Sequence, residues 1–239
     1  MTSTSAPSGA QVTRIVVLGT GTGVGKTWVT RTLSEALGRA GAWVVALKPV
    51  ETGVDPTAAT DASVLASASS EPPAPPPFVF RDPISPHLAA RRAGSSVAID
   101  AILEYVRKSE NDMTSHVTPF VLVECAGGCF SPLAPGVTNE HLARALEPAI
   151  WILVAPDALG VLHDVSATLG ALGARGRMPD YVVLSAAREP DASTGTNAQE
   201  LASLAIAAPV ATVGRGNASA LDELARRLVL RATEAAAKR

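Results

Sequence analysis

The chain reads VTRIVVLGTGTGVGKTWVTRTL from Val12 to Leu33, and this stretch decides the fold. Its first part, Val12 to Leu18, is apolar and β-branched, which predicts a buried strand. Apolar residues then recur at helical spacing from Thr27 to Ala40, which predicts a helix that ends at Gly41. A glycine-rich segment, Gly19 to Thr27, joins the strand to the helix.

The glycine-rich segment has the chemistry of a phosphate loop. Glycines let the backbone turn so that several N–H groups point at one anion, and the following helix adds its positive N-terminal end. Lys26 is placed to neutralise phosphate charge, and the Thr27 hydroxyl is placed to bind magnesium. The spacing departs from the strict pattern, because Thr20 stands five residues before Gly25. The alternative is a flexible glycine turn whose lysine is merely solvated.

The rest of the chain alternates strand-like and helix-like segments. Further strands are expected at Trp43–Leu47, Phe120–Val123, Ala149–Ala155, Tyr181–Leu184 and Val210–Val213. Further helices are expected at Ile99–Arg107, Asn139–Leu146, Leu159–Arg175, Asn197–Ile206 and Ser219–Ala236. Continuous apolar strands between helices are typical of a mostly parallel sheet with helices on both faces. The sequence therefore predicts an α/β fold, a three-layer sandwich of the P-loop NTPase type.

The length of the chain favours a single domain. A chain of 239 residues fits one large α/β domain better than two small ones. We expect the domain to cover residues 12–239, after a disordered tail from Met1 to Gln11 that is rich in small and polar residues. The alternation breaks in a long insertion at about residues 52–98. There, five prolines between Pro72 and Pro77 favour an extended, semi-rigid loop.

The composition excludes several classes of protein. Hydrophobic residues make up 47% and charged residues 18%, which is typical of a globular chain. A formal net charge of −2 gives no basic field for nucleic acid or for a membrane surface. Two cysteines exclude a disulfide framework, and no apolar run has the length of a membrane span. The first residues lack the pattern of a secretion signal, so the cytoplasm is the expected location.

Polar residues lie at or after the ends of predicted strands, where an open α/β sheet binds its ligands. Lys48 follows the second strand, Asp61 stands at the predicted start of a short helix, and Glu124 ends the third strand. A lysine facing a phosphate loop favours charge neutralisation, and carboxylates there favour magnesium. Each residue also has an ordinary interpretation: a surface lysine, an N-cap aspartate and a solvated strand end.

Three other segments carry reactive side chains with ordinary explanations. Ser85-Pro86-His87 is typical of a helix start, although His87 could still reach a ligand from the first turn. Cys125 and Cys129 lack further zinc ligands at suitable spacing, so two free thiols are expected. His163 stands beside Asp164, which is consistent with a charge-paired structural histidine.

Taken together, these motifs resemble the dethiobiotin synthetase family. The motifs that carry the resemblance occur in the family order: Gly19–Thr27, Lys48-Pro49-Val50 with Thr52-Gly53, Asp61, Pro83–His87, and Val123-Glu124 with Ala126-Gly127-Gly128. They span about Val12 to Val213. Many ATPases share the phosphate loop, whereas the lysine-proline-valine and serine-proline-histidine segments are far more specific.

The resemblance implies an ATP-dependent cyclo-ligase of biotin synthesis. Its substrates are 7,8-diaminopelargonate, carbon dioxide and ATP. One amine captures carbon dioxide as a carbamate, ATP phosphorylates the carbamate to a mixed anhydride, and the second amine closes the ring as phosphate leaves. Such chemistry needs charge neutralisation and positioning more than a protein nucleophile. The family works as a homodimer in which the neighbouring subunit completes each substrate site.

The resemblance also implies roles for individual residues. Lys26 and Lys48 are the implied catalytic residues. The implied magnesium ligands are Thr27, Asp61 and Glu124. The implied nucleotide contacts are Gly23, Val24, Gly25, Lys26, Thr27, Trp28, Asp61, Glu124, Cys125, Ala126, Gly127, Ser185, Ala186 and Gly216. The implied substrate contacts are Thr22, Thr52, Ser85, His87, Gly160 and His163.

Three positions depart from the family pattern. Cys125 stands where members usually have glycine, and His163-Asp164 replaces an asparagine-histidine pair. Ser185 stands where many members carry an asparagine that reads adenine, which leaves the nucleobase preference open. Asp164 would repel a substrate carboxylate close to it unless a cation paired with the aspartate. A paralogue that acts on a related amine is therefore an alternative.

Two rivals come from other classes of protein. A partition-type ATPase switch usually carries a signature lysine early in its phosphate loop, where this chain has Gly21. A regulatory or structural paralogue would bind nucleotide without the chemistry. Lys48 and Glu124 argue against such a loss, and the change at His163-Asp164 argues for it.

Overall fold

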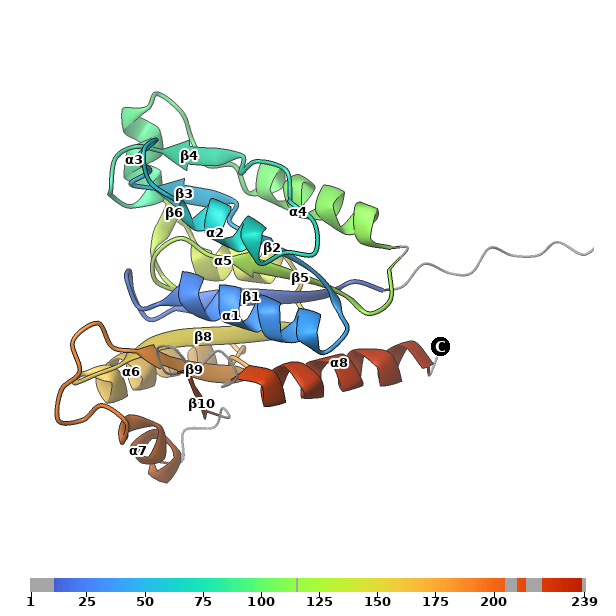
Figure 1. The fold of residues 1–239 in the computed structure, drawn as a ribbon. Coiled ribbons are helices and arrows are strands. Elements are labelled where there is room, and N and C mark those ends of the chain that lie inside the picture. The colour runs from blue at the N-terminus through green and yellow to red at the C-terminus, as the bar shows by residue number, and fades with distance from the viewer. Residues whose placement is uncertain (1–10, 115, 205–209, 214–220, 238–239) are drawn as a thin grey trace, which may run out of the picture.

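A six-stranded parallel sheet forms the centre of the molecule, with the strand order β10-β9-β8-β1-β5-β2 (Figure 1). The computed structural model describes residues 11–114, 116–204, 210–213 and 221–237. The strands of this sheet are β1 (Thr13–Gly19), β2 (Trp43–Leu47), β5 (Pro119–Glu124), β8 (Ile150–Asp157), β9 (Tyr181–Ala186) and β10 (Val210–Val213). Two small sheets pair β3 (Val50–Thr52) with β4 (Phe78–Phe80) and β6 (Pro132–Ala134) with β7 (Val137–Thr138).

Helices cover both faces of the central sheet (Figure 1). One face packs against α1 (Lys26–Arg39), α2 (Asp61–Ser67) and α8 (Asp222–Ala237). The other face packs against α4 (Ile99–Met113), α5 (Asn139–Ala145), α6 (Val161–Ala174) and α7 (Asn197–Ser203), whereas α3 (Pro86–Arg92) packs against the strands of the two small sheets. The predicted three-layer α/β architecture is therefore confirmed.

The alternation of side chains along β1 explains the two layers. Ile15 and Val17 belong to the core cluster on the α1 side, whereas Val16 and Leu18 belong to the cluster on the opposite side. All four are fully buried, as expected for a strand with a helical layer on each face. Leu33 of α1 is also fully buried, so its truncation to alanine would cost about 2–5 kcal/mol of stability.

The order of the strands creates the place for a ligand. β1 lies between β5 and β8, and the chain leaves it towards β2 on one side before it later builds β8 on the other. A parallel sheet binds ligands beyond the carboxyl ends of its strands at such a reversal. The glycine-rich loop follows β1 and therefore lies at this point.

The insertion after β2 contains two short strands that the sequence does not indicate, in addition to the helices expected near Asp61 and Pro86. It holds β3, α2, β4 and α3, and β3 pairs with β4 in parallel across the proline-rich segment. Within that segment, the Ala74 carbonyl accepts a hydrogen bond of 2.8 Å from the Tyr105 hydroxyl on α4. The hydroxyl contact ties the extended loop to the body of the domain.

Most element boundaries agree with the predicted ones to within a few residues. The clearest error is α4, which continues to Met113 instead of ending at Arg107, because the polar turn beyond Arg107 is held by contacts from other elements. Glu110 in that turn accepts two hydrogen bonds from Arg14, and Met113 is fully buried. The tail at residues 1–10, the predicted ends at Ile206 and Ser219, and Gly216 lie outside the described residues.

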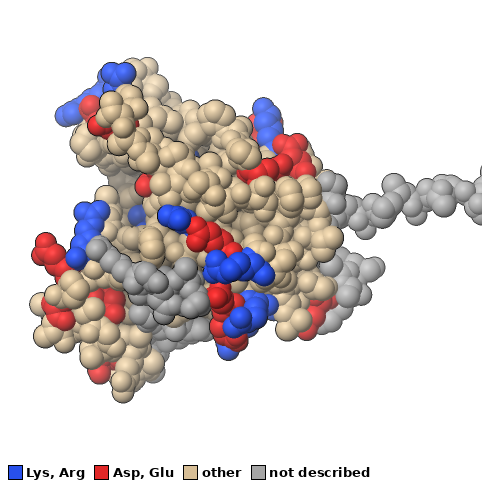
Figure 2. All heavy atoms as spheres, viewed as in Figure 1, with Lys and Arg blue, Asp and Glu red and all other residues tan. Residues whose placement is uncertain are grey.

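Basic and acidic side chains are mixed on the face shown in Figure 2, where no continuous basic patch is visible. The same view shows the surface hollowed at the left, between the insertion and the body of the domain, on the side of the carboxyl ends of the strands. In the described part of the chain, no helix combines the length and the hydrophobicity needed to cross a bilayer.

Candidate active site

The phosphate loop turns sharply because two of its glycines adopt left-handed backbone angles. Gly23 has a φ of 74° and Gly25 has a φ of 89°, a region that side chains with a Cβ rarely adopt. α1 begins directly after Gly25, so its free N–H groups face the loop. Lys26 folds back over the loop and donates a hydrogen bond of 3.0 Å to the Gly21 carbonyl. The loop thus combines a positive side chain with a positive helix end.

The end of β9 contacts the phosphate loop. The Ser185 hydroxyl donates a hydrogen bond of 2.6 Å to the Val24 carbonyl. A Cβ on Gly25 would lie 2.5 Å from Ser185 Oγ, so only glycine allows this close approach. Ser185 is buried and lines the same cavity as the loop, but its hydroxyl is engaged with the backbone.

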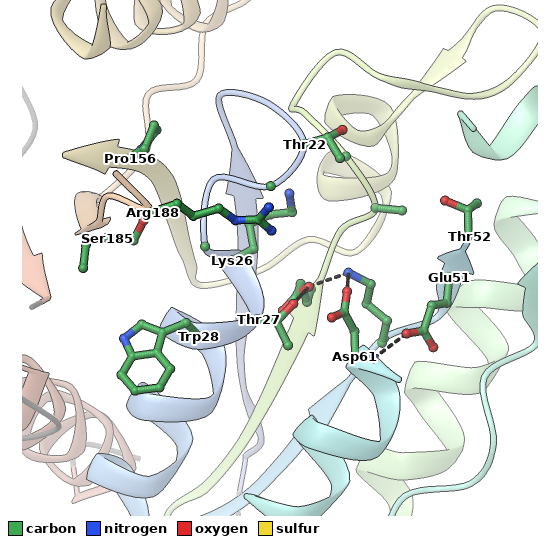
Figure 3. A pocket seen from close by; sticks show the side chains of 17 residues that line it. Thr22, Lys26, Thr27, Trp28, Glu51, Thr52, Asp61, Pro156, Ser185 and Arg188 are labelled. Atoms are coloured by element: carbon green, nitrogen blue, oxygen red, sulfur yellow. Dashed lines mark hydrogen bonds and ion pairs between the residues drawn. The ribbon is translucent and has the colours of Figure 1, made fainter. Parts of the chain in front are cut away.

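Residues from three further elements meet beside the phosphate loop (Figure 3). Lys48, just after β2, forms ion pairs with Glu124 at the end of β5 and with Asp61 at the start of α2. The distance from Lys48 Nζ to Asp61 Oδ2 is 3.0 Å. The Thr27 hydroxyl of α1 donates a hydrogen bond of 2.9 Å to Glu124 Oε1. Residues that are 97 positions apart in the sequence are therefore in direct contact.

Burial makes this cluster electrostatically strong. Lys48 is 5% exposed and Glu124 is fully buried, so their charges interact in a medium of low polarity. Burial by itself lowers the pKa of Lys48, but the carboxylates of Glu124 and Asp61 outweigh it and raise that pKa above its usual value. The two carboxylates therefore favour the charged form of Lys48.

The pKa of Lys26 is shifted in the opposite direction. Burial and the charge of Lys48 lower the pKa of Lys26 to about 8, against the weaker opposing pull of Glu124. The Lys26 ammonium lacks a carboxylate partner in the described part of the chain. An anion beside Lys26 would favour its protonated form.

Glu51 positions Asp61. The Glu51 carboxylate, on β3, accepts a hydrogen bond from the Asp61 backbone N–H at the first turn of α2. The Thr60 side chain caps the same helix through the Ser63 N–H at 3.1 Å. Burial raises the pKa of Glu51 above its usual value. Glu51 and Thr60 together fix where α2 begins, and so fix the Asp61 side chain relative to Lys48.

One cavity of about 620 Å³ joins these groups, large enough for a nucleotide together with a small substrate. Figure 3 shows the side chains of the cavity arranged around the phosphate loop. The lining residues are Thr22, Gly23, Gly25, Lys26, Thr27, Trp28, Lys48, Glu51, Thr52, Asp61, Glu124, Ala126, Gly127, Pro156, Ser185, Ala186 and Arg188.

The oxygen atoms of the cavity fit a magnesium ion. Glu124 Oε2 is buried and has no hydrogen-bond partner within the described residues. A buried carboxylate oxygen without a partner is costly unless a ligand supplies one. No cluster of three or more acidic, histidine or cysteine ligands occurs in the same described regions. Magnesium does not require one, because it commonly uses one or two carboxylates with phosphate oxygens and water.

The chain matches the family model described as an AAA domain over residues 13–218. It is 38% identical to an ATP-dependent dethiobiotin synthetase of Anaeromyxobacter sp. strain Fw109-5, over 74% of this chain and 78% of that protein. It is 35% identical to the enzyme of the same name from Caulobacter sp. strain K31, over 90% of this chain and 94% of that protein. The chain belongs to the dethiobiotin synthetase family.

A solved structure shows the same fold at a lower sequence identity. HypB from Helicobacter pylori, in complex with nickel, superposes with a TM-score of 0.56 at 14% identity. The superposition covers 93% of this chain and 88% of HypB. The fold is that of a P-loop NTPase, as the sequence predicts.

In this dethiobiotin synthetase family member, most of the predicted nucleotide contacts that fall within the described residues lie around one cavity, but two of them do not line it. The Val24 side chain is buried in the core, and the Val24 carbonyl accepts a hydrogen bond from the Ser185 hydroxyl. Cys125 is buried, its N–H donates to the Val17 carbonyl at 3.0 Å, and burial raises the pKa of its thiol to about 12. Both residues therefore pack behind the residues that line the cavity and do not line it themselves. Cys129 is likewise a buried free thiol, as predicted.

The predicted substrate contacts fall into two groups. Thr22 and Thr52 line the cavity. The others lie outside it: Ser85 and His87 contact each other at 3.0 Å, whereas Gly160 and His163 lie exposed at the start of α6.

Sequence reasoning missed three residues that line the cavity: Glu51, Pro156 and Arg188. Glu51 lies inside a motif that was recognised, and its acidic side chain beside Lys48 was the available signal. Pro156 and Arg188 follow apolar strand segments, and position after a strand was the only signal for them.

Proposed function

We propose that this chain is an ATP-dependent dethiobiotin synthetase, which converts 7,8-diaminopelargonate, carbon dioxide and ATP into dethiobiotin, ADP and phosphate. One observation carries the proposal. Lys26, Lys48, Asp61 and Glu124 converge on one cavity in a chain that belongs to this family. A nucleotide-binding relative without the chemistry would not need a second buried lysine held between two carboxylates.

The reaction needs two condensations driven by one phosphoryl transfer. An amine nitrogen attacks carbon dioxide and loses a proton, which gives a carbamate. A carbamate oxygen then attacks the γ-phosphorus of ATP, and ADP leaves with the electron pair of the broken bond. The second amine attacks the carbonyl carbon of the mixed anhydride, phosphate leaves, and the ring closes.

The two lysines supply the charge that these steps require. Negative charge builds on the carbamate and on the transferring phosphoryl group, and fixed positive charges in a water-poor site stabilise it. Lys26 serves the phosphates from the loop. Lys48 reaches the same region from β2, and Asp61 and Glu124 keep it protonated and in place.

Magnesium, held by Thr27, Asp61 and Glu124, would neutralise phosphate charge when bound. The chain's own contribution is orientation. The Thr27 hydroxyl contacts Glu124, and Glu51 fixes the start of α2, so the three oxygen-bearing side chains are placed before any ligand arrives.

The substrate site is proposed to lie beside Thr22 and Thr52, at the Lys48 end of the cavity. In this proposal, a homodimer completes the substrate site. The neighbouring subunit would contribute the predicted substrate contacts that lie outside the chain's own cavity, which are Ser85, His87, Gly160 and His163. The proposed location is the cytoplasm.

The test is to incubate the purified chain with 7,8-diaminopelargonate, bicarbonate, magnesium and a panel of nucleoside triphosphates. Phosphate release and the mass of the cyclic urea are both measured, and omission of the diamine is the control. We expect one cyclic urea for each phosphate released. Phosphate release that does not depend on the diamine would favour an ATPase switch, and nucleotide binding without either product would favour a non-catalytic paralogue.

A further inference from the structure

Arg188 lies in the cavity without an assigned role. It follows β9, its side chain is exposed, and it points towards Lys26 over the phosphate loop (Figure 3). Within the described part of the chain, its guanidinium forms neither a hydrogen bond nor an ion pair. An arginine that lines a cavity with all its donors free is available to a ligand.

The charges of the cavity divide into two ends. Lys48 is paired with Asp61 and Glu124, so that end holds a nearly balanced cluster. Lys26 and Arg188 lie at the other end and have no carboxylate partner among the described residues. Two unpaired cations that point into one cavity, next to a helix N-terminus, create a strong preference for an anion.

The segment that carries Arg188 is anchored on both sides of the residue. Before it, Ser185 is bound to the phosphate loop. After it, the Asp191 carboxylate accepts a hydrogen bond of 2.8 Å from the Leu159 N–H. Farther along, the buried Asp157 accepts bonds of 2.9 Å from the Gly195 N–H and 2.8 Å from Asn197 Nδ2. The backbone therefore presents the guanidinium from a fixed base, which lowers the entropy cost of binding.

We propose that Arg188 binds the phosphate chain of the nucleoside triphosphate, on the side of the phosphate loop opposite Lys48. This inference rests on the nucleotide site proposed above. Guanidinium groups bind phosphate oxygens in a bidentate geometry that a lysine cannot reproduce. Arginine also keeps its positive charge at every working pH. Arg188 thus adds a second positive charge beside Lys26 at the phosphates.

Calorimetric titration of Arg188→Ala with a non-hydrolysable ATP analogue, ADP and AMP, each with magnesium, tests the proposal. Arg188→Lys keeps the charge but loses the bidentate geometry, and Arg231→Ala removes an exposed arginine of α8, far from the cavity. We expect Arg188→Ala to weaken binding of the triphosphate about tenfold and of AMP less than about twofold. Arg188→Lys should give an intermediate loss, and Arg231→Ala should match the unaltered chain.

The remaining outcomes separate this inference from the proposed function. If the unaltered chain binds nucleotide and Arg188→Ala binds each of the three ligands as tightly as the unaltered chain does, the role of Arg188 is refuted. The nucleotide site then still stands. An equal loss for the triphosphate and AMP would place the guanidinium at the nucleoside or the α-phosphate, which both ligands share, and would refute a contact with the β- and γ-phosphates. If the unaltered chain binds no nucleotide, the proposed function fails first.

Discussion

At the scale of single residues, the site depends on a lysine held between two acids. Lys48 compensates the charge of Glu124, which is fully buried, and of Asp61, which is half-exposed. Removal of one partner from a buried ion pair leaves the other uncompensated and typically costs about 3–5 kcal/mol. Lys48 therefore affects stability as well as chemistry, and a test of its role must separate the two.

Lys48→Ala should abolish turnover while nucleotide affinity stays within about tenfold of the unaltered chain, because Lys48 acts mainly on the reacting groups. Turnover is measured as cyclic urea formed, affinity by calorimetry, and folding by thermal melting. Lys48→Arg keeps the charge beside the carboxylates and should keep most of the stability but little of the activity. An equal loss of turnover and nucleotide affinity in Lys48→Ala would make Lys48 a binding residue only.

The pH dependence of nucleotide binding should report on Lys26. Its pKa is about 8 because of burial and of Lys48, and bound phosphates raise it. Below pH 8 Lys26 is already charged, so binding takes up no proton there. Above pH 8 binding must take up a proton, and affinity should fall by up to about tenfold per pH unit.

Titrations at pH 7 and 9, in buffers with different ionisation enthalpies, measure this proton uptake. We expect almost none at pH 7 and close to one proton at pH 9, with uptake lost in Lys26→Arg, which stays charged. Flat affinity and no uptake at pH 9 would show that the Lys26 pKa is not lowered. For the same group, the free energy of unfolding should rise with pH between about 8 and 10.5, because the unfolded chain binds the extra proton there.

Sequence reasoning found the residues whose position along the chain carries the signal. Lys26, Lys48, Asp61 and Glu124 stand at strand ends or helix starts, and parallel strands place such positions at one edge of the sheet. Arg188 and the bond from Ser185 to Val24 depend on the path of a loop and on one rotamer. Position after a strand was the only sequence signal for Arg188, and neither periodicity nor composition encodes the direction of its side chain or the bond from Ser185.

At the scale of elements, the phosphate loop and the end of β9 act as one unit. Gly25 has a φ of 89° and packs against Ser185, which binds the carbonyl of Val24. The predicted strand and helix correctly placed the loop between β1 and α1. They did not predict the contact between this loop and Ser185 at the end of β9. The β3–β4 pair was missed for a related reason: strands of three residues are too short to show a period.

The two residues of this contact should be coupled. Gly25→Ala introduces a Cβ 2.5 Å from Ser185 Oγ and also strains a left-handed backbone by about 1–2 kcal/mol. Ser185→Gly removes the clash but also removes a hydrogen bond worth about 1 kcal/mol. We expect the double variant to bind ATP several-fold more tightly than Gly25→Ala alone, yet more weakly than the unaltered chain. A double variant no better than Gly25→Ala would mean that the backbone strain dominates and that the two residues are not coupled.

At the scale of the whole molecule, the cavity is built from elements on both sides of β1, so filling it should stabilise the entire domain. A ligand at a hundred times its Kd adds about 2.7 kcal/mol of stability. For a chain of this size, that gain corresponds to a rise of about 5–10 °C in Tm.

Thermal melting with ATP, with and without magnesium, measures this gain. We expect chelation of magnesium to remove a large part of it, and Glu124→Gln to make the melting temperature almost insensitive to magnesium. Glu104→Gln, an exposed change on α4, is the control and should respond like the unaltered chain. An unchanged magnesium titration in Glu124→Gln would exclude Glu124 from the metal site.

The three tryptophans of the chain occupy very different surroundings. Trp151 is 2% exposed in the core, and Trp43 stacks on His116 with ring centroids 3.7 Å apart, at the amino end of β2. Trp28 is 37% exposed and is the one that lines the cavity. Its indole is therefore a built-in optical reporter: the change in intrinsic emission when a nucleotide enters should come from this single chromophore, and stopped-flow fluorescence can follow loading and release in the unlabelled protein.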